Sequence, residues 1–433
     1  MLDKTVIGGG AFESTTCDDV AVMSARATIG RLSSSPDSVF NAICEEASRI
    51  CEQQFGRDLR ALILTGSLAR GEGSFIRRNE IWHAFSDAEF IVVLADSARL
   101  PSTTEHRELH NKGNQALQSR GLNCSTSWGV VHADFLRRLQ PSIFAFELRT
   151  CGRVLSGDSS ILSRAPEFER SEIPLEDAWR LLCNRLVESL EILSCLEDEC
   201  ESGSPQLSYR VIKLYLDMCT SLLVFCRVYE PRYSQRAVAL SHLAQSEPAD
   251  TPFSLKEFSK QVSTATELKV SGKNSGNDCP SNRKAMAAVT AEAMDYARKL
   301  WRWELKKLTG SHDDPDDRQL LKRWMSQQGM ARRLRGWAYV CRKQGWHRSW
   351  REWGRWLRLL CQASPRYLVY AVAAEMCFLL PSWPDSPGAL DARFWVDSLP
   401  VCGKIARSDL QQWPALAAAT LWNYHRFVVE TIA

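Results

Sequence analysis

Two carboxylates and a glycine–serine turn are the residues of this sequence best suited to do chemistry. A mostly apolar run, residues 62–65, leads directly into Gly66 and Ser67. Asp87 and Glu89, separated by one residue, open a second apolar run. Because side chains alternate along a strand, these two carboxylates should point to the same face. Two oxygen ligands beside a turn that can approach phosphate suit a divalent cation and a nucleoside triphosphate.

This pattern resembles the polymerase-β-type nucleotidyltransferase superfamily, and within it the small bacterial branches that include aminoglycoside and minimal antitoxin-like nucleotidyltransferases. The resemblance covers residues 40–160 and is carried by Gly-Ser-x-x-x-Gly-Glu and Ser-Asp-x-Glu. It implies that Gly66 and Ser67 hold the triphosphate of a bound nucleotide, with ATP as the expected substrate. It also implies that Asp87 and Glu89 bind Mg²⁺ or Mn²⁺.

The sequence departs from the pattern of that superfamily in two places. The gap between the turn and the acidic pair is longer than usual, and we interpret residues 75–85 as an inserted loop over the site. A third carboxylate is expected on the next strand, residues 123–131, which contains none. The nearest candidates are Asp134 and Glu147. Asp134 is a candidate metal ligand or base, or else it caps the helix that is predicted to follow it.

Two basic residues are further candidates for binding the nucleotide. Arg70 follows the turn, where it either donates to a phosphate or pairs with a neighbour such as Glu72. Tyr209 and Lys213 are four residues apart on a predicted helix. The resemblance implies that a helix of the following domain supplies an aromatic residue and a lysine to the triphosphate. The alternatives for Lys213 are a solvated helix face and an ion pair with Asp217.

Two hypotheses about function follow from these residues. In the first, the protein moves a nucleoside monophosphate from a nucleoside triphosphate to an acceptor hydroxyl, with a divalent metal and an acceptor that the sequence leaves unidentified. In the second, a catalytically degenerate nucleotidyltransferase fold binds a nucleotide or a partner without turnover. The complete turn and acidic pair favour activity, whereas the missing third acid favours binding alone.

The order of strands and helices around these residues predicts an α+β protein, with an N-terminal α/β domain followed by all-helical domains. The resemblance implies that the α/β domain is a nucleotidyltransferase domain. Residues 1–35, rich in small and polar side chains, are expected to be partly mobile. From Pro174 onward, apolar residues recur at helical spacing and no strand is predicted. An acidic stretch, residues 309–317, is expected to be a linker. The predicted domains are therefore the nucleotidyltransferase domain at 36–165, a helical domain at 174–308 and a helical C-terminal region at 319–433.

The C-terminal region is basic and rich in tryptophan. Residues 319–362 carry eleven Lys or Arg side chains, a single acid and six Trp. One interpretation is a buried aromatic stripe with a solvated basic face. A second is a surface for an anionic partner such as nucleic acid or an acidic protein. A third is a helix lying in a membrane interface. The notable residues are Trp346, Trp350 and Trp353 on one predicted face, with Arg348, Arg351, Arg355 and Arg358 on neighbouring faces.

Composition bounds the class of protein without indicating its activity. At 433 residues the chain is longer than a domain with a single hydrophobic core usually is, so two or three domains are expected. The net charge of +3 implies no particular partner. The 15 cysteines form no C-x-x-C pair, which favours reduced thiols in the cytoplasm over disulfides or a zinc site. No secretory signal is expected, because residues 1–10 lack a basic segment followed by an apolar run. No membrane span is expected, because the longest apolar run, residues 367–380, is too short and contains Glu375.

Overall fold

The structure, a computed structural model, describes most of the chain. The predicted mobile segment lies outside the described residues except for Ser35. The description covers residues 35–78, 81–122, 124–197, 205–246, 248–271, 283–345, 352–378, 397–401 and 413–429.

The chain divides into two compact units. The boundary after Ile173 coincides with the predicted change to helices at Pro174. The further division of the helices into two domains stays a prediction. Unit 1 comprises Met1–Ile173, Pro231–Tyr233 and Glu267–Ser275, and unit 2 comprises Pro174–Glu230, Ser234–Thr266 and Gly276–Ala433.

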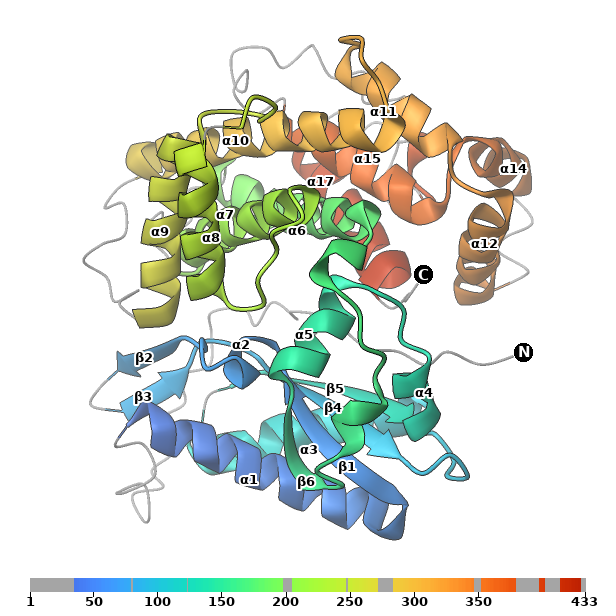
Figure 1. The fold of residues 1–433 in the computed structure, drawn as a ribbon. Coiled ribbons are helices and arrows are strands. Elements are labelled where there is room, and N and C mark those ends of the chain that lie inside the picture. Colours follow the sequence, from blue (N-terminus) through green and yellow to red (C-terminus); the bar gives the residue numbers. More distant parts are fainter. Residues whose placement is uncertain are drawn as a thin grey trace. The chain divides into compact units, whose positions relative to one another are not determined.

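Unit 1 is built on a four-stranded sheet of order β5-β4-β1-β6 (Figure 1). Strand β1 pairs antiparallel with β4 and β6, while β4 and β5 are parallel. The end of β1 therefore lies beside the beginning of β4, and the beginnings of β4 and β5 lie together. The strands are β1 (Leu59–Thr65), β4 (Ala88–Leu94), β5 (Thr126–His132) and β6 (Arg153–Gly157).

Helices cover both faces of this sheet, which explains why its central strands are continuously apolar. Leu62 and Leu64 of β1 share a core with α1 (Pro36–Phe55) and α3 (Thr103–Ser119). Ala61 and Ile63 share a core on the other face with α4 (Ala133–Arg137) and α5 (Ile143–Cys151). Both α1 and α3 begin at a serine in a capping box, which fixes their first residues.

The segment interpreted as an inserted loop over the site forms a β-hairpin, so the loop conformation was wrong, while its place over the site stays a prediction. Strands β2 (Phe75–Arg78) and β3 (Ile81–Ala84) pair antiparallel. Phe75 and Trp82 are partly buried against the core that contains α1. These two aromatic side chains thus anchor the hairpin to that core. Unit 1 also contains the short helices η1 (Gly56–Asp58), α2 (Gly66–Ala69), η2 (Ile161–Arg164) and η3 (Arg170–Glu172).

The remaining elements are helices, and together with the sheet they confirm the predicted α+β class. Helix α6 packs against α7, α10, α15 and α17 in unit 2. Helix α9 starts in unit 2, and its last residues, from Glu267, belong to unit 1. The helices are α6 (Leu175–Glu197), α7 (Pro205–Phe225), α8 (Tyr233–Ser246), α9 (Leu255–Ser271), α10 (Arg283–Thr309), α11 (Asp317–Ser326), α12 (Met330–Gln344), α14 (Trp353–Gln362), α15 (Pro365–Phe378), α17 (Trp413–Tyr424) and a π-helical turn (His425–Val429).

The apolar run near residue 370 forms α15, whose side chains are almost all buried, as the sequence predicted. Within the described ranges, no helix combines the length and the apolar character that crossing a bilayer requires. The cysteines that the structure describes are free thiols.

Candidate functional site

The paired carboxylates lie at the beginning of β4. Asp87 immediately precedes the strand, and Glu89 is its second residue. Ala88 and Phe90, which alternate with them, are buried, whereas Asp87 is half-buried and Glu89 is exposed. Phe90 faces the core of α1 and α3. The alternation along the strand therefore directs Asp87 and Glu89 toward the face covered by α4 and α5.

Gly66 brings the turn after β1 against the Glu89 carboxylate. Thr65 is the register partner of Glu89 in the antiparallel pair of β1 and β4. Gly66 has a φ of +70°, and a Cβ at this position would lie 2.6 Å from Glu89 Oε1. The left-handed backbone thus favours glycine here, and a larger residue would have to displace the Glu89 carboxylate. The half-buried Ser67 follows, and its carbonyl accepts the Glu72 N–H at 2.9 Å.

Replacing Gly66 with Ala is expected to displace the Glu89 carboxylate and to weaken Mg²⁺-ATP binding, measured by titration calorimetry. The new methyl group would meet Glu89 Oε1 at 2.6 Å. A matched control is Gly121→Ala, because Gly121 has a similar φ of +73° but open space around an added Cβ. Both variants carry the same backbone strain, roughly 1–2 kcal/mol. Equal nucleotide affinity in the two variants would show that contact with Glu89 is unimportant.

Strand β5 brings serines to the carboxylates. The register places Ser127 beside Glu89, and the Ser125 carbonyl accepts the Ala88 N–H at 2.8 Å. Among the described residues, no group of three or more His, Cys, Asp or Glu side chains is arranged to hold a metal ion. Within the described ranges, no third carboxylate therefore joins Asp87 and Glu89 in a metal-ligating cluster.

Asp134 lies at the opposite end of the sheet from this pair. Asp134 stands two residues after His132, and His132 is paired with Leu94. Leu94 is five strand positions from Glu89, which corresponds to about 16 Å. Asp134 forms an ion pair with Arg138, and its N–H donates to Asp96 Oδ1 at 2.8 Å. It does not cap α4 either, because the N-cap residue is His132. We therefore leave Asp134 out of the metal site that we propose.

Arg70 is buried in a network of ion pairs, with 7% of its surface exposed. Its guanidinium pairs with Glu147 and lies 3.7 Å from Glu72 Oε2, measured from Nε. The Tyr233 ring lies 4.8 Å from the guanidinium carbon, and the Tyr233 N–H donates to Glu72 at 2.8 Å. The alternative of an ion pair with a neighbour is thus the arrangement observed for Arg70. Glu147, a candidate for the third acid, is part of the same network.

Lys269 is a buried residue beside this site that the sequence analysis missed. Its ammonium donates to Ser74 Oγ at 3.0 Å and to Ser86 Oγ at 2.8 Å. The signal that would have revealed it is helical spacing, because Lys269 continues a stripe of buried apolar residues on α9. A lysine at a core position is rare unless its charge is hydrogen-bonded. The preceding residues of this stripe are Leu255, Phe258, Val262 and Ala265.

Lys213 belongs to unit 2, where its ammonium lies 5.0 Å from the centre of the Tyr209 ring. Asp217, the ion-pair candidate, accepts a hydrogen bond of 2.7 Å from Arg185 Nε. A contact between Lys213 and a nucleotide stays a prediction.

The basic, tryptophan-rich region buries part of its aromatic residues. Trp337 and Trp356 are each 5% exposed, and their ring centres lie 5.8 Å apart. Their indole N–H groups donate to the carbonyls of Ala363 and Pro400. For these two tryptophans, the interpretation as a buried aromatic stripe is the observed one.

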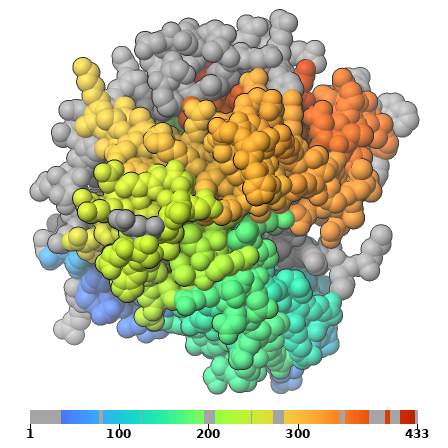
Figure 2. Space-filling view, turned by 45° about the horizontal axis from the view of Figure 1, so that its top comes forward, coloured from blue at the N-terminus to red at the C-terminus, as the bar shows by residue number. Residues whose placement is uncertain are grey.

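The arginines of this region differ in their surroundings. Arg355 donates to backbone carbonyls of residues 399–400, so it stabilises the fold. Arg335, Arg342 and Arg358 are exposed. Figure 2 shows α11 and α12, in orange, forming a continuous part of the surface. An anionic partner here stays a prediction. Trp346, Trp350, Arg348 and Arg351, which the sequence analysis named, lie outside the described residues.

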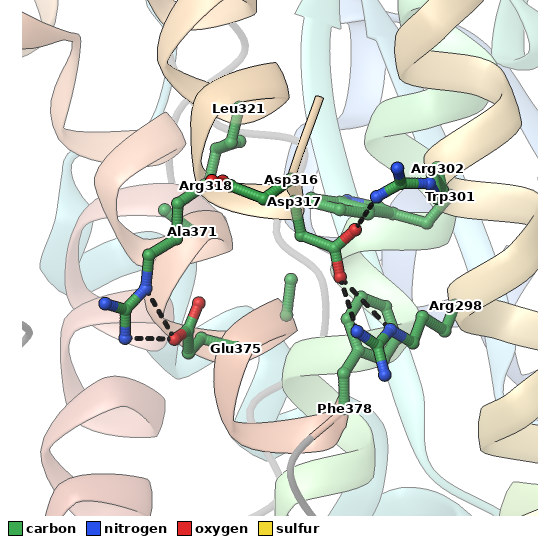
Figure 3. Close-up of a pocket in the computed structure, with 11 residues that line it drawn as sticks. Arg298, Trp301, Arg302, Asp316, Asp317, Arg318, Leu321, Ala371, Glu375 and Phe378 are labelled. Carbon is green, nitrogen blue, oxygen red and sulfur yellow. Dashed lines mark hydrogen bonds and ion pairs between the residues drawn. The ribbon is translucent and has the colours of Figure 1, made fainter. Parts of the chain in front are cut away.

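A pocket of about 320 Å³ lies between α10, α11 and α15 in unit 2 (Figure 3). Its arginines are matched by carboxylates in the same pocket. Asp317 accepts from Arg298 and Arg302, and Glu375 accepts from Arg318. Because these charges neutralise one another, we assign no ligand to this pocket.

Comparisons with known proteins add little to this geometry. No protein-family model matches the chain, and no curated protein matches it. A solved structure with some similarity is that of spectinomycin adenyltransferase AAD(9) from Enterococcus faecialis with ATP and spectinomycin. It is 11% identical, covers 60% of this chain and 98% of its own, and has a TM-score of 0.34. That similarity is too low to support a function, so the function proposed below rests on the site.

Proposed function

We propose that unit 1 is a metal-dependent nucleotidyltransferase domain. It moves a nucleoside monophosphate from a nucleoside triphosphate, with ATP as the expected nucleotide, to an acceptor hydroxyl. The observation that supports this most is the contact geometry of Gly66 and Glu89, with Asp87 on the same face at the beginning of β4. A turn without a side chain beside two carboxylates suits a phosphate chain and a cation together.

Asp87 and Glu89 would hold Mg²⁺ or Mn²⁺ in this proposal. The donor set fits, because Mg²⁺ in nucleotide sites is bound by one or two carboxylates and takes further oxygens from phosphate and water. A bound ion would neutralise charge on the triphosphate and on the pyrophosphate leaving group. Without a cation, two neighbouring carboxylates would repel an anionic nucleotide.

The other residues of the turn would bind and orient the triphosphate. Gly66 and Ser67 offer backbone N–H groups, and Ser67 adds a hydroxyl donor. In the transfer, the acceptor oxygen forms a bond to the α-phosphorus, the bond to the bridging oxygen of pyrophosphate breaks, and the hydroxyl proton leaves to solvent. The chain's contribution is to hold these atoms in line.

The second candidate is a nucleotide-binding module without turnover. It is favoured by the paired, rather than triple, carboxylates among the described residues. The discriminating experiment incubates the protein with α-labelled nucleoside triphosphates, Mg²⁺ or Mn²⁺, and panels of small-molecule and protein acceptors. Label transfer with pyrophosphate release supports the transferase. Calorimetric binding without transfer supports the module, and the absence of both rejects the two proposals together.

A further inference from the structure

The turn that carries Asp87 begins at the base of the β2–β3 hairpin. The Ser74 N–H donates to Ser86 Oγ at 2.8 Å, and the Phe85 N–H donates to the Ser74 carbonyl at 2.8 Å. Both serines are buried. On the other side of Asp87, the Ala88 N–H is held by the Ser125 carbonyl. Asp87 is therefore fixed from both sides, and Ser86 is its support on the hairpin side.

Lys269 closes the base of the hairpin. Its ammonium donates to the hydroxyls of both serines, and its own carbonyl accepts the Ser74 hydroxyl at 2.8 Å. These hydrogen bonds join the last turn of α9 to the residue that precedes Asp87. Bonds from a charged donor are stronger than neutral ones, and inside a protein they are strengthened further.

We propose that Lys269 is a positioning residue for the Asp87 carboxylate; this inference rests on the proposed function. Lys269 is 2% exposed, so it acts through Ser86 rather than by touching a substrate. Two features then hold Asp87 in place: the hydroxyl bonds from Lys269 to the hairpin base, and the pairing of β4 with β5. Without the Lys269 ammonium, the turn at Ser86 would be more mobile, and the Asp87 carboxylate would adopt a wider range of orientations.

The experiment compares Lys269→Met with Lys260→Met in the full chain. Lys260 is an exposed lysine on the same helix and provides the same chemical change without the buried contacts. Hydrogen exchange of the ligand-free protein measures opening at the amides of Phe85, Ser86 and Ala88. Mn²⁺ binding, followed by electron paramagnetic resonance, measures the carboxylate site. We expect faster exchange at these amides and about tenfold weaker Mn²⁺ binding in Lys269→Met alone, as for lost supports of metal ligands.

The two readouts separate failure of this inference from failure of the proposed function. Unchanged exchange in Lys269→Met, or faster exchange with unchanged Mn²⁺ affinity, overturns the positioning role. If the wild-type protein binds no Mn²⁺, the proposed function is overturned, while faster exchange would still show that Lys269 holds the turn that precedes Asp87. Should Lys269→Met fail to fold, Ser86→Ala removes one acceptor and is expected to give a smaller change in the same directions.

Discussion

Replacing Asp87 with Asn is expected to lower nucleotidyl transfer by about a thousandfold, the effect of losing several kcal/mol of charge stabilisation. Asn keeps the size and shape of the side chain but removes the negative charge that a divalent cation needs. Asp87 is half-buried and belongs to neither of the two hydrophobic cores beside the sheet, so the substitution should preserve folding. The measurements are label transfer, Mn²⁺ affinity and the melting temperature.

The matched control for this variant is Asp134→Asn. It makes the same chemical change at the other end of the sheet, where Asp134 pairs with Arg138. We expect transfer and Mn²⁺ affinity to stay at wild-type levels in this variant. Normal turnover by Asp87→Asn would show that the site lies elsewhere. A loss of Mn²⁺ binding in Asp134→Asn would restore Asp134 to the metal site.

Replacing Glu304 with Gln is expected to remove a large dependence of stability on pH. Glu304 lies on α10, fully buried, and accepts a hydrogen bond of 2.6 Å from Ser221 Oγ. Its Oε2 atom has no hydrogen-bond partner among the described residues. Burial raises the pKa of this carboxyl from 4.5 to about 8, because the charged form loses its hydration. Near neutral pH the folded protein therefore holds a neutral glutamic acid in its helical core.

The sign of the effect follows from proton binding in the folded and unfolded states. Below pH 4.5 both states hold the proton, and above about pH 8 both release it. Between these values only the unfolded state is ionised, so the free energy of unfolding falls as the pH rises. The total fall is on the order of a few kcal/mol. Gln stays neutral and keeps a carbonyl acceptor for Ser221. The free energy of unfolding of Glu304→Gln, relative to that of the wild type, should therefore increase as the pH rises through this window.

Urea denaturation at pH values in and on either side of this window provides the measurement. Glu292→Gln is the control, because Glu292 is an exposed acid on the same helix. We expect the control to keep the wild-type pH dependence and Glu304→Gln to flatten it. Parallel curves for wild type and Glu304→Gln would mean that this carboxyl is ionised, or hydrated, in the folded protein.

Much of the fold was predictable because its signals are local. Strand β1 is indicated by the apolar run before Gly66, and helix α1 by the helical spacing of its apolar residues. Each signal comes from residues that are close together in sequence. The same holds for the candidate site: the spacing of Asp87 and Glu89 gives their common face without tertiary information. The hairpin was missed because Asn79 and Glu80, which separate its strands in sequence, lack the glycine that signals a tight turn.

The residues that support the site depend on contacts between distant parts of the chain. The ion pair of Arg70 with Glu147 joins α5 to the end of α2, and no spacing rule connects them. Buried charges are still partly visible from periodicity. Lys269 and Glu304 each occupy a position in a helical stripe whose other members are mostly apolar and buried. A charged residue in such a stripe indicates a special environment, although its partner cannot be read from the same helix.

The contact between Lys269 and the hairpin can form only late in protein synthesis. Ser74 and Lys269 are 195 residues apart in sequence. At translation speeds of about 5–20 residues per second, that separation corresponds to roughly 10–40 seconds on the ribosome. The sheet and the Asp87 turn are thus synthesised long before the lysine that secures them. On the positioning role proposed for Lys269, a nascent chain would bind the divalent cation tightly only after α9 has left the ribosome.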